Sequence, residues 1–120
     1  GEAELAGILK GACEGLGVQS VLEDLGVSRD LCLRADSSAA LGICRRLGLG
    51  KVRHLAVGQL WIQQRLRAGA FKLFKHPGKE NPGDLLTKHL SADEMKGHVI
   101  RVGLEYCQGR ADSAPEVVGN

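Results

Sequence analysis

Three acidic residues stand where a metal-dependent reaction could use them. Asp36 directly follows residues 31–35, a short alternating run typical of a strand, and open α/β sheets bind ligands beyond the carboxyl ends of their strands. Asp84 opens a helix after a second predicted strand, and Glu4 lies in the first turn of the opening helix. Carboxylates brought together bind hard cations such as Mg²⁺, and two such ions about 4 Å apart can activate water for phosphodiester hydrolysis.

Each of these carboxylates also has a purely structural explanation. Asp84 could interact with the dipole of its helix, which contributes less than about 1 kcal/mol. Asp36 could be an N-cap, and Glu4 could be a solvated helix residue. The spacing of the acids does not favour a metal site, and for any one acid taken singly the structural explanation is the better one.

Positive charge is concentrated in the middle of the chain. The net charge is only +2, but residues 37–79 contain no Asp or Glu, and all fourteen acidic residues lie outside that segment. Such a segment is expected to attract polyanions, most often phosphate backbones, although a solvated basic face explains the pattern equally well. The basic residues in it are Arg45, Arg46, Lys51, Arg53, Arg65, Arg67, Lys72, Lys75 and Lys79.

The hydrophobic pattern predicts a single α/β domain with two parallel strands and flanking helices, because strands joined through helices lie parallel. We expect the domain over residues 1–106 and a disordered tail over 107–120. The expected inward faces include Ala40, Leu41, Cys44 and Leu47, then Phe71 and Leu73, then Met95, Val99 and Val102. The predicted elements are helices over residues 2–17 and 21–25, a strand over 31–35, a helix over 39–47 capped by Ser37, a helix over 52–66, a strand over 70–75, a helix from Asn81-Pro82-Gly83-Asp84 and a last helix from the capping box Ser91 to Glu94.

Several classes of protein are disfavoured by composition. No segment approaches the roughly 18 apolar residues needed to cross a membrane, and no signal segment opens the chain. The cysteines form no C-x-x-C pair and no zinc-binding spacing with the histidines. We therefore expect reduced thiols in an intracellular protein that is not secreted. The four cysteines are Cys13, Cys32, Cys44 and Cys107.

Four short blocks of the sequence occur in an order that resembles a known family. They are Glu2-Ala3-Glu4-Leu5, Ala35-Asp36-Ser37-Ser38-Ala39-Ala40, Val52-Arg53-His54-Leu55 and Asn81-Pro82-Gly83-Asp84-Leu85-Leu86-Thr87-Lys88. These blocks resemble the EAEY, DNQSA, KHID and NPADxxTK blocks in the ribonuclease H domains of copia-type retrotransposon Pol polyproteins. The match covers about residues 2–105. Single blocks are weak, but four in order with suitable gaps form a specific signal.

The resemblance implies a fold and a chemistry. The family fold is a five-stranded sheet in the order 3-2-1-4-5, of which this chain would supply the last two strands. The family binds two Mg²⁺ or Mn²⁺ ions and cuts the RNA strand of RNA/DNA hybrids, next to an upstream reverse transcriptase domain of the same polyprotein. Glu4, Asp36 and Asp84 would be metal ligands and catalytic acids. The first acid of the family precedes this chain, and His76 would lie in the loop that often carries a mobile, proton-shuttling histidine.

The resemblance and the charge pattern together suggest contacts to nucleic acid. The residues that we expect to make them are Ser37, Ser38, Arg45, Arg46, Lys51, Arg53, Lys75 and Lys79. The chain also departs from the family. Ala56 stands where the KHID block has its acid, and Gly58 stands where a basic residue usually follows that block. His89 stands where the family has a proline after the TK of its last block, and Ser37-Ser38 lacks the amide of DNQSA.

The chain begins with Gly1 and an immediate helical pattern, which suggests a fragment or a processed product. The resemblance implies that the protein acts in a cytoplasmic particle or in the nucleus. An unpaired first strand and a thin core predict that these residues alone are marginally stable and inactive. Two other hypotheses stay open. One is a relic that binds nucleic acid without cutting it, and the other is a helical interaction domain whose acids are caps.

Overall fold

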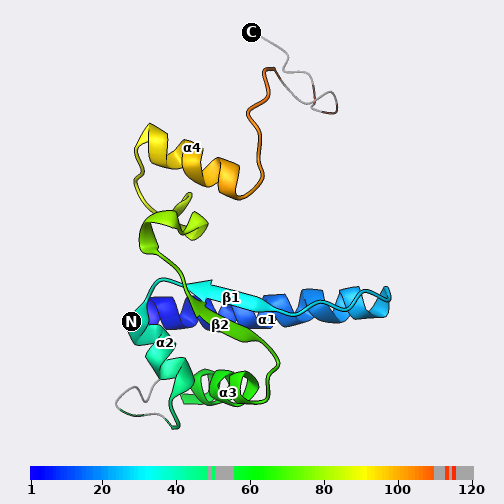
Figure 1. The fold of residues 1–120 in the computed structure, drawn as a ribbon, viewed down its shortest axis with the longest axis vertical. Coiled ribbons are helices and arrows are strands. Elements are labelled where there is room, and N and C mark those ends of the chain that lie inside the picture. Colours follow the sequence, from blue (N-terminus) through cyan, green and yellow to red (C-terminus); the bar gives the residue numbers. More distant parts are fainter. Residues whose placement is uncertain (49, 51–55, 110–112, 114, 116–120) are drawn as a thin grey trace. The chain divides into compact units, whose positions relative to one another are not determined.

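The computed structural model describes residues 1–48, 50, 56–109, 113 and 115, which divide into two compact units, 1–81 and 82–120. The described residues form a mixed α/β structure with one two-stranded parallel sheet, four α-helices and two 3-10 helices (Figure 1). The prediction of two parallel strands with flanking helices is confirmed. In chain order the elements are α1 (Glu2–Asp24), β1 (Cys32–Ala35), α2 (Ser38–Arg45), α3 (Ala56–Arg67), β2 (Lys72–Lys75), η1 (Gly78–Glu80), η2 (Pro82–Asp84) and α4 (Ala92–Arg101).

The opening segment is a single helix, so the prediction of two helices over residues 2–17 and 21–25 was wrong. α1 is continuous for 23 residues and ends before Gly26, whose φ of 79° suits a glycine. Its internal glycines carry a helix penalty of about 1 kcal/mol each, but tertiary packing offsets it. A Cβ on Gly15 would lie 2.6 Å from a methyl carbon of Leu31, so glycine at this position lets the segment entering β1 pack closely against α1.

The sheet has one covered face and one exposed face. Leu33 pairs with Leu73 in the register, and α1 packs against β1 on this side. Phe71 and Leu73 are buried together, as predicted. The opposite face carries Phe74, which is 47% exposed. Within the described residues, the helices of the first unit therefore leave that face of the sheet uncovered.

The buried core belongs to the first unit. Ser37 caps α2 by accepting a hydrogen bond from the backbone N–H of Ala40 at 3.2 Å, as predicted. Leu47 lies beyond the end of α2 and is exposed, so its predicted place in the core was wrong. The core residues are Leu5, Ile8, Ala12, Ala40, Leu41, Cys44, Ile62, Phe71 and Leu73.

α3 contributes a polar layer beside this core that the sequence did not suggest. Ile62 is buried and Leu60 is exposed, and two glutamines of this helix, Gln59 and Gln63, are buried as well. The Gln63 amide donates to the backbone oxygens of Ile43 and Gly48, at 2.9 Å each, and its oxygen accepts from the N–H of Gly48. Gln63 thus satisfies backbone groups in α2 and just after its end, and Gln59 also donates to the backbone oxygen of Gly48 at 3.2 Å.

The second unit contains η2 and α4. The predicted helix at Asn81-Pro82-Gly83-Asp84 is only the short 3-10 helix η2, and the chain soon turns at Leu86, whose φ is 67°. The capping box of α4 is confirmed, because Ser91 and Glu94 exchange hydrogen bonds of 2.9 and 3.3 Å.

The predicted inward face of α4 was wrong in its main residues. Met95 and Val102 are exposed, whereas His98 is only 1% exposed, and its Nδ1 lies 3.3 Å from the guanidinium of Arg101. In a helix this short, the face that packs is set by its neighbour η2 rather than by apolar spacing. Residues 102–109 are exposed, and most of the predicted tail lies outside the described residues.

Candidate active site at the carboxyl end of the sheet

Asp36 is half-buried and directly follows the carboxyl end of β1, where the sequence placed it. The turn at residues 36–38 is held from two sides. On one side, the ammonium of Lys75 donates to the backbone oxygen of Asp36 and, at 2.6 Å, to the hydroxyl of Ser38. On the other side, Ser37 caps α2. Within the part of the chain that the structure describes, the Asp36 carboxylate itself has no hydrogen-bond or ion-pair partner, so its oxygens are available to a ligand.

Glu4 lies at the same end of the first unit as Asp36. α1 runs antiparallel to β1, because Gly15 lies against Leu31 and Gly11 against Leu33. Between these two contacts the chain advances four residues along α1 and two along β1. The corresponding lengths agree, because four helix residues rise about 6 Å and two strand residues about 6.6 Å. The start of α1 is therefore level with the carboxyl end of β1, as the ribbon also shows (Figure 1).

The Glu4 carboxylate is also engaged locally. It lies 2.7 Å from the amino group of Gly1, and its side chain is about half exposed. This ion pair is at the chain terminus and near solvent, where such pairs contribute little to stability. The fold thus brings Glu4 and Asp36 to one end of the sheet, with Glu4 held in the first turn of α1.

The loop at residues 76–80 borders the Asp36 carboxylate. The backbone N–H of His76 extends the ladder by donating to the oxygen of Ala35 at 2.9 Å. The Nε2 of the same histidine lies 3.0 Å from the backbone oxygen of Glu80 and closes the loop. A Cβ on Gly78 would lie 3.7 Å from the Oδ2 of Asp36. The predicted shuttle histidine is thus near the acid, with its Nε2 occupied as a donor to the chain.

Asp84 belongs to the second unit. It lies at the end of η2, is 9% exposed and forms an ion pair of 2.9 Å with Lys88, four residues later. Glu4 and Asp36 belong to the first unit, and the convergence of Asp84 with them stays a prediction. Among the described residues, no three His, Cys, Asp or Glu side chains are gathered in a way that could hold a metal ion. Of the three predicted acids, Glu4 and Asp36 lie in the first unit and Asp84 lies in the second.

The residues predicted to contact nucleic acid have diverse surroundings. Ser37 and Ser38 are used within the turn after β1, and Lys75 is bound to that turn. Lys79 is exposed and Arg46 is half-buried, while Lys51 and Arg53, like the block at residues 52–55, lie outside the described residues.

Arg45 has a structural contact inside the first unit. Its guanidinium donates to the backbone oxygen of Leu73 at 2.8 Å. Because the N–H groups of Lys72 and His76 point toward β1, the oxygen of Leu73 points to the outer edge of β2. Arg45 therefore protects an edge carbonyl of the sheet, which sequence reasoning did not anticipate because the two residues are 28 positions apart.

Gly58, one of the departures from the family pattern, has a packing explanation. A Cβ at this position would lie 2.5 Å from a methyl carbon of Leu9, so a larger residue would force Leu9 to move. A small apolar recess lies beside this contact between α1 and α3. It is below the usual size of a small-molecule site.

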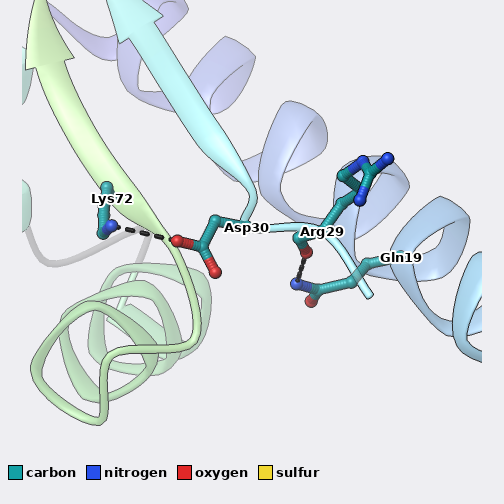
Figure 2. Close-up of polar contacts among 4 residues, drawn as sticks. All are labelled: Gln19, Arg29, Asp30 and Lys72. Atoms are coloured by element: carbon teal, nitrogen blue, oxygen red, sulfur yellow. Dashed lines mark hydrogen bonds and ion pairs between the residues drawn. The ribbon is translucent and has the colours of Figure 1, made fainter. Parts of the chain in front are cut away.

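Sequence reasoning missed the polar contacts at the opposite, amino end of the sheet. Lys72 of β2 donates to the carboxylate of Asp30 at 3.0 Å, and Gln19 of α1 donates to the backbone oxygen of Arg29 at 2.6 Å (Figure 2). The hydrogen bond and charge of Asp30 raise the pKa of the Lys72 ammonium. A small polar recess is lined by Gln19, Asp30 and Lys72. No local signal joins positions 30 and 72, so only the fold could reveal the pair.

None of the described helices is both long enough and apolar enough to cross a membrane. No protein-family model matches the chain, and no solved structure matches it significantly.

Proposed function

We propose that the chain is the C-terminal part of a ribonuclease H-like domain of a copia-type retrotransposon Pol polyprotein. The complete domain would hydrolyse the RNA strand of RNA/DNA hybrids, next to a reverse transcriptase domain. It would act inside the cell, in a cytoplasmic particle or the nucleus. These 120 residues alone are expected to be inactive, because the first acid of the family has no counterpart in them.

The observation that carries the proposal is the position of Asp36. Its carboxylate follows the carboxyl end of a parallel strand pair, has no partner among the described residues and lies at the end where α1 presents Glu4. Ligands of open α/β sheets bind at this edge. The four sequence blocks that resemble the family include both acids, so geometry and sequence support the same site.

The chemistry of the site follows from its ligands. When bound, two Mg²⁺ or Mn²⁺ ions would supply an activated water and charge stabilisation for phosphodiester hydrolysis. Asp36, Glu4 and Asp84 would hold these ions through carboxylate oxygens, which hard cations prefer. Lys79 is exposed on η1, near the loop that borders Asp36, and would meet the phosphate backbone of the hybrid.

Cleavage by the complete domain tests the proposal. A protein extended upstream to include the missing strands is mixed with a labelled RNA/DNA hybrid, with Mg²⁺ or with chelator. We expect Asp36→Asn to reduce cleavage by more than about a hundredfold while hybrid binding is kept. The matched control is Asp30→Asn, an exposed acid at the opposite end of the sheet, which should cut like wild type. Absence of Mg²⁺-dependent cleavage by the wild-type domain would overturn the proposal.

The acid-free segment favours a second candidate, a protein that binds nucleic acid without cutting it. Residues 37–79 carry positive charge that is unmatched by acids within the segment. This hypothesis expects binding by the 120-residue chain that weakens steeply with salt, without cleavage by the extended domain. Lys79→Gln should weaken hybrid binding, whereas Lys10→Gln, which removes a lysine paired with Glu14 on α1, should not. Equal binding by both variants would remove this candidate.

A further inference from the structure

We propose that Lys75 is a positioning residue that fixes the direction of the Asp36 carboxylate. This inference rests on the proposed function, because it concerns the acid that the function requires. Lys75 is the last residue of β2 and pairs in the register with Ala35, the residue before Asp36. Its ammonium is therefore beside the chain at the point where β1 ends and the turn at residues 36–38 begins.

Two hydrogen bonds tie this ammonium to the turn. It donates to the backbone oxygen of Asp36 and, at 2.6 Å, to the hydroxyl of Ser38. Because one cation holds the first and the third residue of the turn, the peptide units between them have little freedom to rotate. Both acceptors are neutral oxygens, so Lys75 restrains the turn without binding the Asp36 carboxylate.

The neighbouring contacts make this restraint effective. The next residue, His76, continues the ladder to Ala35, so the base of the turn is already fixed. Ser37 begins α2 through its cap, so the far side of the turn is fixed as well. Between these two anchors, Asp36 is held by backbone geometry and by Lys75. Catalytic and metal-binding carboxylates need such support, because small displacements of a ligand weaken binding strongly.

Lys72 provides a matched comparison on the same strand. It is also exposed, but its ammonium binds the Asp30 carboxylate at the opposite end of the sheet. Removal of the Lys72 ammonium therefore removes an equal charge from β2 without touching the turn at residues 36–38. An effect of Lys75 that Lys72 does not share must come from the turn and not from the net charge of the strand.

The test compares the full chain with Lys75→Met, Lys75→Arg and Lys72→Met by nuclear magnetic resonance without metal. Two signals are measured, the Hα–Hβ couplings of Asp36, which report side-chain rotation, and the exchange rate of the Ala40 amide, which donates to Ser37. We expect averaged Asp36 couplings and about five- to tenfold faster Ala40 exchange in Lys75→Met. Lys75→Arg should restore both signals, and Lys72→Met should match wild type.

Unchanged couplings in Lys75→Met, or equal changes in Lys72→Met, would overturn the inference. If Lys75→Met loses its helical circular dichroism, the folded Lys75→Arg variant serves as the test instead. Averaged Asp36 couplings in Lys75→Arg would then overturn the inference. A Mn²⁺ titration of wild type separates this inference from the proposed function. Line broadening at Asp36 supports its role as a ligand, and lack of broadening counts against that role, whereas the metal-free signals still decide whether Lys75 holds the turn.

Discussion

The two ends of the sheet use the same kind of residue in opposite ways. At the amino end, Lys72 neutralises Asp30 in an exposed ion pair (Figure 2). At the carboxyl end, Lys75 binds a backbone oxygen and the hydroxyl of Ser38, and the Asp36 carboxylate has no partner among the described residues. Two lysines three positions apart on one strand thus produce one neutral pair and one available carboxylate.

The difference indicates which end can do chemistry. An exposed ion pair contributes little to stability, and its cation partly neutralises the charge of the carboxylate. The Asp36 carboxylate, which has no partner within the described part of the chain, keeps its full charge on a backbone that Lys75 ties down. The available carboxylate of Asp36 therefore lies at the same end of the sheet as Glu4, and not at the end with the polar recess.

Alkylation of the cysteines should show the largest contrast between the ends. Cys32 begins β1 at the amino end and is exposed, whereas Cys44 is buried in α2, the helix that starts at the carboxyl end. Burial raises the pKa of the Cys44 thiol, and the nearby Arg45 lowers that pKa by a smaller amount. The net increase in pKa reduces the fraction of Cys44 that is thiolate. Mass spectrometry after iodoacetamide treatment should find Cys44 modified at least about tenfold more slowly than Cys32. Equal rates would show that α2 is not packed in solution.

Removal of the cap at the carboxyl end should be the next largest effect. Ser37→Ala leaves the N–H of Ala40 without its side-chain acceptor and should lower the free energy of unfolding by about 1 kcal/mol. Urea unfolding followed by circular dichroism measures this loss. Ser28→Ala, an exposed position before the amino end of β1, is the matched control and should be neutral. A similar loss in both variants would contradict the assigned cap.

Alkaline pH should destabilise the chain through Cys44. Folding raises the pKa of the Cys44 thiol, so the folded state keeps the proton at a higher pH than the unfolded state does. The contribution of this thiol to the free energy of unfolding is therefore fully present below the unfolded pKa, about 8.5. Stability is then lost as the pH rises from about 8.5 through the folded pKa. Urea unfolding at pH 7.5 and 9.5 should show a larger decrease in wild type than in Cys44→Ala. An equal decrease in both would assign the pH dependence to other groups.

The smallest effect should come from the ion pair at the amino end. Folding raises the pKa of Lys72 through the hydrogen bond and charge of Asp30, so the contribution of the pair is present below about pH 10.4 and is lost above it. Because both groups are exposed, added salt should screen this contribution at neutral pH. The melting temperature of Lys72→Met should therefore be close to that of wild type, and it should change less with added salt. A large drop in melting temperature would mean that the pair has a greater structural role.

Local signals predicted much of the first unit. The strands at residues 31–35 and 70–75 were placed within one residue or two because they are short alternating runs, and their parallel pairing followed from the helices between them. The Ser37 cap and the Ser91–Glu94 capping box were also predicted, since each depends on residues three or four positions apart. Predictions failed where packing overrode a local penalty, as in the single helix α1.

The candidate site divides in the same way. The position of Asp36 after a strand was visible in the sequence, and so was the resemblance that singled it out. The Lys75 contacts to the turn, the Arg45 contact to Leu73 and the Gln63 contacts to Gly48 were not visible, because they join residues 15 to 39 positions apart. The convergence of Asp84 with the other acids stays a prediction.

By itself, the sequence determined the two strands, the caps of two helices and which acid follows a strand, because hydrophobic period and capping act over a few residues. Only the tertiary structure decided that the Asp36 carboxylate has no partner among the described residues, whereas Asp30 pairs with Lys72. That outcome depends on which lysine of β2 lies beside each acid, and the register of two strands separated by two helices sets it. Long-range pairing of this kind leaves no periodic trace in the chain.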